Sequence, residues 1–549
     1  MKQIFSFFSR KQSTIGSAAF VLMSMVLASR VLGLFRDRLL ASYFSPDELG
    51  VYFAAFRVPN MIFELLVMGA LTSAFIPVFT KYKSHNGESQ AWHMTSSLIN
   101  VSLVVFALFA FPFFFWTREV SQFLAPGFSP TELEQMVMYT RFMMIGQVVP
   151  LLIGNFFTGI LQSYNLFLIP AIAPVVYNIG IIAGTIILYP LYGLFAPVYG
   201  VGIGALLFML IQIPLLLSIG YRYSAVLDVK NPGVREVGKL MAPRTMGLAI
   251  SQIDTTVDLM LASLLGAKMV TVFNFAQHLQ QLPIGLFGAT IAQAALPSLS
   301  QSSADDNREQ FRLAIISSLH QVFFFVFPST VLFIVLRVPI VRLVFGASRF
   351  DWEATSLTGI TLAAFSVSLF AQAAVHVLAR GFYALYDTKT PVFVGVISIA
   401  INTLLSIYFV KIMGYPVWSL GVSTSVSSIV NGVLLYVLLD RKLKNIGTRS
   451  FYEPVIKMFI ASLATGIMLY IPLKLLDQLV FDTTRAFPLL LLTGTASGIG
   501  CVTYLFLSWV FGITQVQSVF SFIQRMKKPR VFLEPASEAV DSGAQDSVS

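Results

Sequence analysis

The chain has 549 residues, of which 56% are hydrophobic and only 11% are charged, and its mean hydropathy is +0.78. An average globular domain is about a quarter charged, so this composition excludes a water-soluble fold and predicts an all-α polytopic membrane protein. The net charge of +10 fits basic residues kept in cytoplasmic loops better than a nucleic-acid partner. The single cysteine, Cys501, excludes an intramolecular disulfide.

A helix needs about 20 mostly apolar residues to cross the hydrocarbon core of a bilayer. The sequence predicts about fourteen such transmembrane helices, at residues 15–43, 50–80, 92–116, 132–160, 167–188, 192–219, 238–265, 269–299, 311–336, 354–384, 391–412, 417–439, 452–475 and 486–512. An even number of spans places both termini on the same side of the membrane.

Basic residues mark the cytoplasmic side of a multi-span protein. Lysines and arginines precede the first span and follow the second, sixth, twelfth and fourteenth, whereas an opposite loop carries Asp47 and Glu48. This pattern predicts a multi-pass protein of the bacterial cytoplasmic (inner) membrane with both termini in the cytoplasm. Residues 1–14 are then a cytoplasmic N-terminal segment, and residues 513–549 are a cytoplasmic tail expected to be disordered.

The two halves of the chain resemble each other at an offset of about 220 residues. AFIP (74–77) lies over AALP (294–297), LAS (40–42) recurs at 261–263, and PVYGVG (197–202) matches PVWSLG (416–421). Each copy holds six spans, so both copies have the same orientation, as in parallel transporter repeats. We therefore expect two six-helix lobes, residues 15–220 and 221–445, that rock around a cavity, and a terminal helix pair at 446–512.

The first span carries arginines inside the membrane. Arg30 lies about 20 Å along this helix at 1.5 Å per residue, which is too deep for easy snorkelling, so its side chain should face protein or water. Arg36 and Arg38 lie nearer the outer interface. For these two, snorkelling to headgroups with Asp37 as a local partner is the alternative to a role in a binding site.

Arg57 and Asn60 flank Pro59 in the second span. A proline inside a helix breaks or kinks it and frees a carbonyl, which Arg57 and Asn60 could satisfy. Equally, both side chains could line a polar cavity beside Arg30. Guanidinium groups suit bidentate recognition of phosphate, so arginines that converge on a cavity favour an anionic substrate.

The seventh span carries SQIDTTVD, which places Asp254 and Asp258 one turn apart on one helical face. Acids inside a membrane mark ion or proton sites. Asn402, with Ser406 one turn further on, and Thr424 could add oxygen ligands, so Asp258, Asn402 and Thr424 form a candidate sodium site. The alternative is that these groups hydrogen-bond to one another and hold the helices together.

His278 falls near the Arg57 region of the first lobe under the 220-residue offset. A lone histidine inside a membrane is more often a hydrogen-bonding residue than a ligand, although its place on a cavity-facing helix adds some weight to a site role. The sequence contains no P-loop, no zinc-ligand spacing and no GxSxG motif. We therefore expect no enzymatic activity and no cofactor, with sodium or a proton as the only coupling ion.

Several stretches resemble the MurJ (MviN) family: SRVLGLFRD (29–37), FRVPN (56–60), APGF (125–128), YNLFLIPAIAPVVYN (164–178), PIVRLVFGASRFDWEAT (339–355) and ARGFYALYDTKTP (379–391). This family comprises lipid II flippases of the multidrug/oligosaccharidyl-lipid/polysaccharide (MOP) exporter superfamily. The resemblance implies fourteen spans in two lobes plus a terminal pair. It also implies transport of the undecaprenyl-pyrophosphate-linked peptidoglycan precursor to the outer leaflet, with the lipid tail in a groove formed by spans 13 and 14.

The resemblance also assigns residues. Arg30 and Arg36 match the two first-helix arginines of the family, Arg57 matches a basic position, and Asn60 is the asparagine after the proline. Ser29, next to Arg30, completes the predicted headgroup site. The implied partners are lipid II or a related polyprenyl-pyrophosphate glycolipid and membrane lipids, without nucleic acid. We expect a monomer that could contact cell-wall synthesis enzymes.

The sequence departs from the family pattern at several positions of this site. Phe63 and Glu64 stand where other members have an arginine pair, His278 replaces an arginine, and Ser406 replaces an acid near the sodium position. The family resemblance implies that this sodium position is formed by the three residues already named, Asp258, Asn402 and Thr424. The less cationic cavity leaves three alternatives open: an exporter of another polyprenyl-linked glycan, a cation-coupled drug exporter, and a non-transporting scaffold for envelope assembly.

Overall fold

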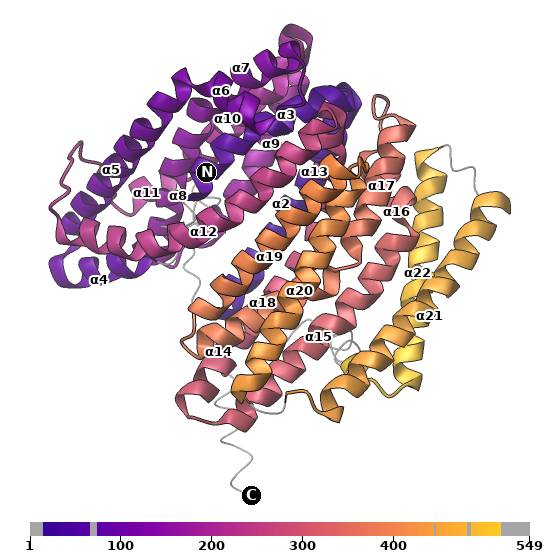
Figure 1. Cartoon of the computed structure of the whole chain (residues 1–549). Coiled ribbons are helices and arrows are strands. Elements are labelled where there is room, and N and C mark those ends of the chain that lie inside the picture. Colours follow the sequence, from indigo (N-terminus) through magenta and orange to yellow (C-terminus); the bar gives the residue numbers. More distant parts are fainter. Residues whose placement is uncertain (1–14, 66–73, 444–445, 480–484, 518–549) are drawn as a thin grey trace, which may run out of the picture. The chain divides into compact units, whose positions relative to one another are not determined.

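The computed structural model describes residues 15–65, 74–443, 446–479 and 485–517, and within these ranges every regular element is a helix (Figure 1). The all-α prediction is therefore confirmed. The expected N-terminal segment 1–14 and most of the expected tail, 518–549, lie outside the described residues.

The helices follow one another with short connections. The first half of the chain contains α2, Ile15–Tyr43; α3, Pro46–Phe63; α4, Ile76–Asn86; α5, Glu88–Phe115; α6, Thr117–Leu124; α7, Pro130–Gly146; α8, Val148–Ser163; α9, Leu168–Tyr192; η3, Gly193–Phe195; α10, Ala196–Leu210; α11, Ile213–Ser218; and α12, Pro232–Leu264. The second half contains α13, Ala267–Pro283; η4, Ile284–Ala289; α14, Thr290–Ala304; α15, Arg308–Val335; α16, Arg337–Phe345; α17, Trp352–Ser366; α18, Leu369–Ala384; α19, Lys389–Ile407; η5, Tyr408–Ile412; α20, Trp418–Leu443; α21, Arg449–Leu479; and α22, Ala486–Val510.

The number of membrane spans is smaller when it is judged by length and apolarity alone. Nine helical segments of the described chain are long and apolar enough to cross a membrane, or ten if α17 and α18, which meet at a 45° bend, form one span. Within the described residues, each of the fourteen expected segments coincides with one helix or with consecutive helices, and residues 66–73 of the second segment lie outside them. The count of fourteen stays a prediction.

Helix starts near the expected loops are fixed by side-chain caps. The Ser45 hydroxyl accepts a hydrogen bond from the Glu48 amide, and the Glu48 carboxylate accepts one from the Ser45 amide at 2.7 Å, which forms a capping box at the start of α3. Ser129 and Glu132 repeat this arrangement at α7. Asn231 caps α12 in the connection between the two predicted lobes. These caps satisfy amide groups that have no partner within their own helix.

One compact unit of the fold comprises residues 1–282, 336–371 and 387–434. Within it α9 packs along α10 and α2, and α3 packs on α7. The α9–α10 contact is made by glycines. A Cβ atom at Gly180 would lie 2.5 Å from the Gly204 Cα atom, and one at Gly184 would lie 2.6 Å from that of Gly200. The two backbones therefore touch directly, as at small-residue interfaces of membrane helices.

The other compact unit comprises residues 283–335, 372–386 and 435–549. Its described part is built around α15, which packs against α14 and α21, while α21 packs along α22. Aromatic rings fill these contacts, with Phe287 stacked on Phe325 at 4.9 Å between ring centroids and Phe324 beside Tyr504 at 5.4 Å. The expected groove for a lipid tail along residues 446–512 stays a prediction. The same holds for the lobe boundaries, which were drawn from the repeat and not from contacts.

Candidate functional site

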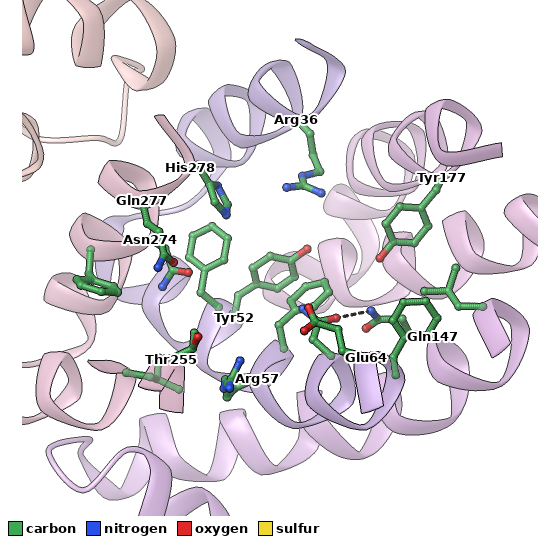
Figure 2. Close-up of a pocket in the computed structure, with 17 residues that line it drawn as sticks. Arg36, Tyr52, Arg57, Glu64, Gln147, Tyr177, Thr255, Asn274, Gln277 and His278 are labelled. Carbon is green, nitrogen blue, oxygen red and sulfur yellow. Dashed lines mark hydrogen bonds between the residues drawn. The ribbon is translucent and has the colours of Figure 1, made fainter. Parts of the chain in front are cut away.

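A polar cavity of about 470 Å³ opens among helices of the first compact unit (Figure 2). Its lining comes from α2, α3, α8, α9, α12 and α13, so it gathers residues from both predicted lobes. The lining residues are Arg36, Tyr52, Phe53, Phe56, Arg57, Asn60, Phe63, Glu64, Gln147, Leu151, Tyr177, Thr255, Leu259, Phe273, Asn274, Gln277 and His278. Four of the predicted headgroup residues, Arg36, Arg57, Asn60 and His278, are among them.

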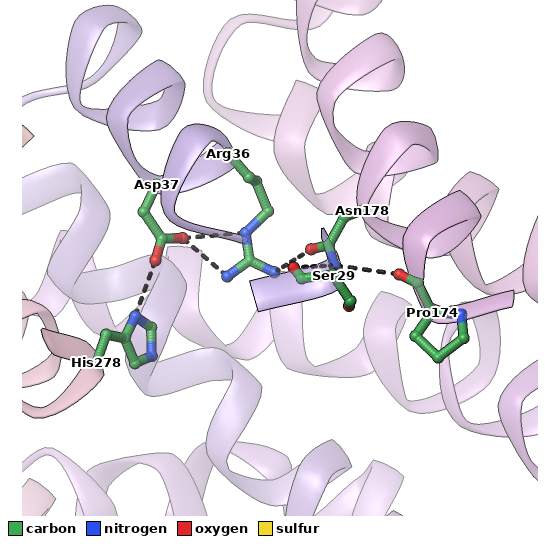
Figure 3. Close-up of polar contacts among 6 residues, drawn as sticks. All are labelled: Ser29, Arg36, Asp37, Pro174, Asn178 and His278. Carbon is green, nitrogen blue, oxygen red and sulfur yellow. Dashed lines mark hydrogen bonds and ion pairs between the residues drawn. The ribbon is translucent and has the colours of Figure 1, made fainter. Parts of the chain in front are cut away.

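Arg36 is held from two sides (Figure 3). Its Nη2 and Nε atoms donate to Asp37 Oδ1 at 2.8 and 3.0 Å, and its Nη1 donates to Asn178 Oδ1 at 3.2 Å. Asp37 is only 1% exposed, and its other oxygen lies 2.8 Å from Nδ1 of His278 on α13. A buried carboxylate needs such partners to stay charged. Asp37 thus joins the first and second predicted lobes at the cavity wall.

Ser29 belongs to the same network, one step further from the cavity. The Asn178 amide donates to the Ser29 hydroxyl at 3.2 Å and to the Pro174 carbonyl at 3.1 Å (Figure 3). With its amide group fixed in this way, Asn178 presents its oxygen to Arg36. Ser29 therefore acts through Asn178 and does not line the cavity.

Arg57 bonds to α12 and not to its own helix. Its Nη2 donates to the Gln252 carbonyl at 2.6 Å, and its Nε and Nη2 lie 3.1 and 2.9 Å from the Thr256 hydroxyl. The carbonyl that Pro59 frees is bonded by a residue of another helix, and not by Arg57 or Asn60. Pro59 lacks the amide that would bond the Ala55 carbonyl, and the Thr140 hydroxyl of α7 donates to that carbonyl at 3.3 Å. Arg57 and Asn60 are thus left to line the cavity.

An acid and several amides offset the cationic groups. Glu64 lines the cavity and accepts a hydrogen bond from the Gln252 side chain. The Gln147 amide donates to Asn60 Oδ1 at 2.9 Å. With one arginine bonded to Asp37 and a second near Glu64, the cavity combines guanidinium groups with neutral polar and aromatic surface.

The other arginines of the first span lie outside the cavity lining. Arg30 donates through Nη1 to the Gln281 carbonyl of α13 at 3.1 Å. Arg38 donates to the carbonyls of Arg342, at 3.5 Å, and of Leu343, both on α16. The three arginines that the sequence grouped together therefore have three different environments.

The predicted ion-site residues meet on another face of α12. The Asn402 amide of α19 donates to Asp254 Oδ1 at 2.9 Å and to the two oxygens of Asp258 at 3.3 and 3.5 Å. Thr424 bonds to the Leu420 carbonyl of its own helix at 3.0 Å. The structure thus joins three of the four candidates by hydrogen bonds and links Thr424 to none of them among the described residues.

Unsatisfied polar atoms lie in the neighbourhood of this carboxylate pair. Asn402 is 2% exposed and its Oδ1 has no hydrogen-bond partner, nor has the hydroxyl of the buried Ser406 one turn away. Two carboxylates and two unsatisfied oxygens form an oxygen-rich donor set of the kind that hard cations prefer. The donor set therefore fits a sodium ion or a proton. No group of three or more acids, histidines or cysteines suited to a metal occurs in the described residues.

Sequence reasoning missed residues that hold the site together. Asp37 was treated only as a local partner, and Asn178, Gln147, Tyr52 and Tyr177 were not singled out, although Tyr177 and Asn178 lie within the stretch 164–178. The residues Arg36 and Asn178 are 142 positions apart. Their pairing depends on how α2 packs on α9, which one sequence alone does not reveal.

Comparisons with known proteins agree with this picture. The family model described as "Lipid II flippase MurJ" matches residues 18–488. A lipid II flippase MurJ from Burkholderia cenocepacia is 26% identical over 447 residues, which cover 80% of this chain and 84% of the relative. A probable lipid II flippase MurJ from Vibrio cholerae is 29% identical, with 76% and 81% covered.

Solved structures show the same fold. A lipid II flippase MurJ in an inward closed conformation aligns with a TM-score of 0.74 and 25% identity, covering 90% of this chain and 98% of the other. An inward-facing multidrug resistance MATE family transporter of the MOP superfamily aligns with a TM-score of 0.66 at 14% identity, covering 78% and 98%.

The many apolar helices and the polar cavity among them define a multi-pass membrane protein whose fold matches those of a lipid II flippase and of a MATE family transporter. Within that class the family is settled by the match over most of the chain. The chain belongs to the MurJ family of lipid II flippases, as its motifs indicated.

Proposed function

We propose that this protein moves lipid II, the undecaprenyl-pyrophosphate-linked peptidoglycan precursor, from the inner to the outer leaflet of the bacterial cytoplasmic membrane by alternating access. The observation that carries the proposal is the cavity lined by Arg36 and Arg57, in a chain of the MurJ family. Family membership does not favour the drug exporter or the scaffold. Transport without chemical conversion requires no catalytic group.

The headgroup would bind mainly through oriented guanidinium groups. Arg36 is already directed by Asp37 and Asn178, so less conformational entropy is lost when it binds a phosphate. His278 shares Asp37 and is placed to add a second donor from the other lobe. The amides of Asn60, Gln147 and Gln277, together with Tyr52, offer neutral hydrogen bonds to the uncharged parts of the headgroup.

A cation bound at Asp254, Asp258 and Asn402 would couple ion movement to reorientation. These residues and the Arg57 partners Gln252 and Thr256 occupy different faces of the same helix, α12. A change at the carboxylates can thus reach the cavity through one rigid element. Two adjacent buried carboxylates disfavour each other's negative charge. The bound ion would supply the compensating positive charge.

The remaining features follow from the same proposal. The basic connections support a cytoplasmic position for both termini by the positive-inside rule. We propose that the protein works as a monomer and receives its substrate where the enzymes of cell-wall synthesis release it. The lipid tail would stay in the membrane beside α21 and α22.

The proposal is tested by replacing the host's own lipid II flippase with this chain and measuring lipid II at the outer leaflet. We expect the parent chain to restore it and Arg36→Gln to lower it at least tenfold, because a charge-assisted hydrogen bond to phosphate contributes roughly 1.5–3 kcal/mol. The matched control is Arg118→Gln, an exposed arginine outside the cavity. A well-expressed parent chain that fails to restore outer-leaflet lipid II would overturn the proposal.

A further inference from the structure

Arg38 makes an unusual contact for a membrane arginine. Its Nη1 atom donates to the carbonyls of Arg342, at 3.5 Å, and of Leu343, in the last turn of α16. The carbonyls at the end of a helix carry partial negative charge. The Arg342 carbonyl already accepts a hydrogen bond from the Gly346 amide at 2.9 Å, whereas the Leu343 carbonyl is among the last four, which have no partner within the helix. A guanidinium group is therefore well matched to this position. It binds the end of a helix that lies 304 residues away in the chain.

The contact joins the two predicted lobes at the outer side of the membrane. Arg38 belongs to the outer end of the first span, and α16 follows the ninth span in the second lobe. Two neighbouring hydrogen bonds follow the same seam: Ser348 donates to the Ser42 carbonyl at 3.1 Å, and Thr271 donates to the Pro46 carbonyl at 2.6 Å. With these contacts formed, the outer ends of α2 and α3 are attached to α13 and to the α16–α17 connection.

The backbone packing of this seam is tight as well. A Cβ atom at Gly50 of α3 would overlap the carbonyl of Ala267 at the start of α13. A Cβ atom at Gly127 would likewise overlap the carbonyl of Ser263 at the end of α12. At both positions the backbones of the two predicted lobes are therefore in direct contact, with no side chain between them. These contacts and the hydrogen bonds together define the seam that we call the outer gate.

We propose that Arg38 holds this outer gate closed, as a latch. Its hydrogen bonds to α16 keep the two lobes together while the cavity faces the cytoplasm, and these bonds break when the cavity opens outward. The inference rests on the alternating access in the proposed function. Arg38 is half-buried near the membrane interface, so both the freed guanidinium and the freed carbonyls can be hydrated on opening. Breaking the Arg38 contact therefore costs little enough free energy to be reversible, whereas breaking such a contact near the bilayer centre would cost more.

Arg38 is a positioning residue, because it does not line the cavity. Its hydrogen bonds to α16 change the ratio of inward-facing to outward-facing molecules. A residue that merely stabilised α16 would change overall stability without changing the ratio of inward-facing to outward-facing molecules. A latch changes that ratio, because its contacts exist in only one of the two states. The ratio is thus the quantity to measure.

The test uses disulfide cross-linking across the seam in native membranes. In a Cys501→Ser background, which removes the only native thiol, Ser42→Cys and Ser348→Cys would report the closed outer gate. We expect Arg38→Gln to shift the equilibrium about tenfold toward the open gate, equivalent to about 1.4 kcal/mol, and to lower the cross-linking rate accordingly. Arg38→Lys keeps the charge but loses the planar fork, so it should give an intermediate rate.

The matched control is Arg349→Gln, an exposed arginine in the same outer connection that makes no hydrogen bond or ion pair with the described residues. Cross-linking unchanged in Arg38→Gln, or lowered equally in the control, overturns the latch. If the glutamine variant does not reach the membrane, a parent-like rate in Arg38→Lys overturns it instead, and a reduced rate supports it. Cross-linking requires no substrate, so a parent chain that moves no lipid II but shows the Arg38 effect would refute the proposed function and keep the latch.

Discussion

At the scale of single residues, the site depends on one buried acid. Asp37 receives Arg36 on one oxygen and His278 on the other. In the sequence Asp37 is only the neighbour of an arginine, and such a pair at a membrane interface does not by itself indicate a binding site. Only the packing of α2 against α13 makes it the point where groups from two lobes meet. Of the two arginines that the family resemblance assigned to the headgroup site, Arg36 lines the cavity, whereas Arg30 donates to the Gln281 carbonyl of α13 and is not among the lining residues.

Replacing Asp37 by asparagine removes the charge but keeps the shape. We expect Asp37→Asn to lower the free energy of unfolding by roughly 3 kcal/mol, because breaking a buried ion pair leaves Arg36 without a compensating charge. His278→Gln removes one hydrogen bond and keeps the Arg36 pair, so its cost should be about 1 kcal/mol. Thermal unfolding in detergent compares the two. Equal stability of the parent and Asp37→Asn would contradict the central position given to this acid.

At the scale of helices, the expected elements are present but several partners were unforeseen. Helices form most of the described part of each expected span, and Asp254 and Asp258, which the SQIDTTVD spacing put on one helical face, both accept hydrogen bonds from Asn402. The carbonyl freed by Pro59 was expected to bond within its own neighbourhood, yet Thr140 of α7 satisfies it. Periodicity reports which face of a helix is polar. It does not report which other helix that face will meet.

The start of α17 gives a prediction that depends on pH. Asp351 caps this helix through the Ala354 amide at 2.7 Å and pairs with Lys268 at 2.7 Å. Partial burial opposes ionisation of Asp351, but the hydrogen bonds from Lys268 and Ala354 outweigh it and lower the pKa of the carboxyl group below its ordinary value. Its contribution is therefore complete above the ordinary pKa of about 3.9 and is lost as the pH falls through the lowered pKa.

Asp351→Asn retains a good helix cap and loses the ion pair. We expect it to lower the melting temperature slightly at pH 7, because a half-exposed pair contributes less than about 1 kcal/mol. The decrease should be smaller at pH 3, because the contribution of the pair is lost as the pH falls from about 3.9 through the lowered pKa of Asp351. Asp351→Ala also loses the cap and should cost about 1 kcal/mol more at both pH values. A difference between parent and Asp351→Asn that persists unchanged at pH 3 would exclude the ion pair as its cause.

At the scale of the whole molecule, composition and repeat predicted the class of protein, and the motifs predicted its family. The proposed coupling ion acts on the full transport cycle. Asn402, which donates to both carboxylates, keeps an unsatisfied oxygen, and this arrangement motivates a direct test of cation dependence. The driving force can be distinguished by exchanging one ion at a time.

We expect flipping by the reconstituted protein to fall at least fivefold when sodium is replaced by choline at constant pH and membrane potential, if sodium is the coupling ion. Asp258→Asn should remove this dependence, because one carboxylate near a neutral amide attracts a cation far less than two. The readout is the initial rate of lipid II appearance in the outer leaflet. Rates equal in sodium and choline, but sensitive to an imposed pH gradient, would assign the coupling to protons.

The glycine contact between α9 and α10 has a mechanical consequence. With Gly180 and Gly184 set against Gly204 and Gly200, no side chains separate the two backbones that could yield under load. Where the glycines meet, the two helices therefore have to move together. Bending during transport is expected at points outside this contact, such as the proline of α3 and the bent junction of α17 and α18.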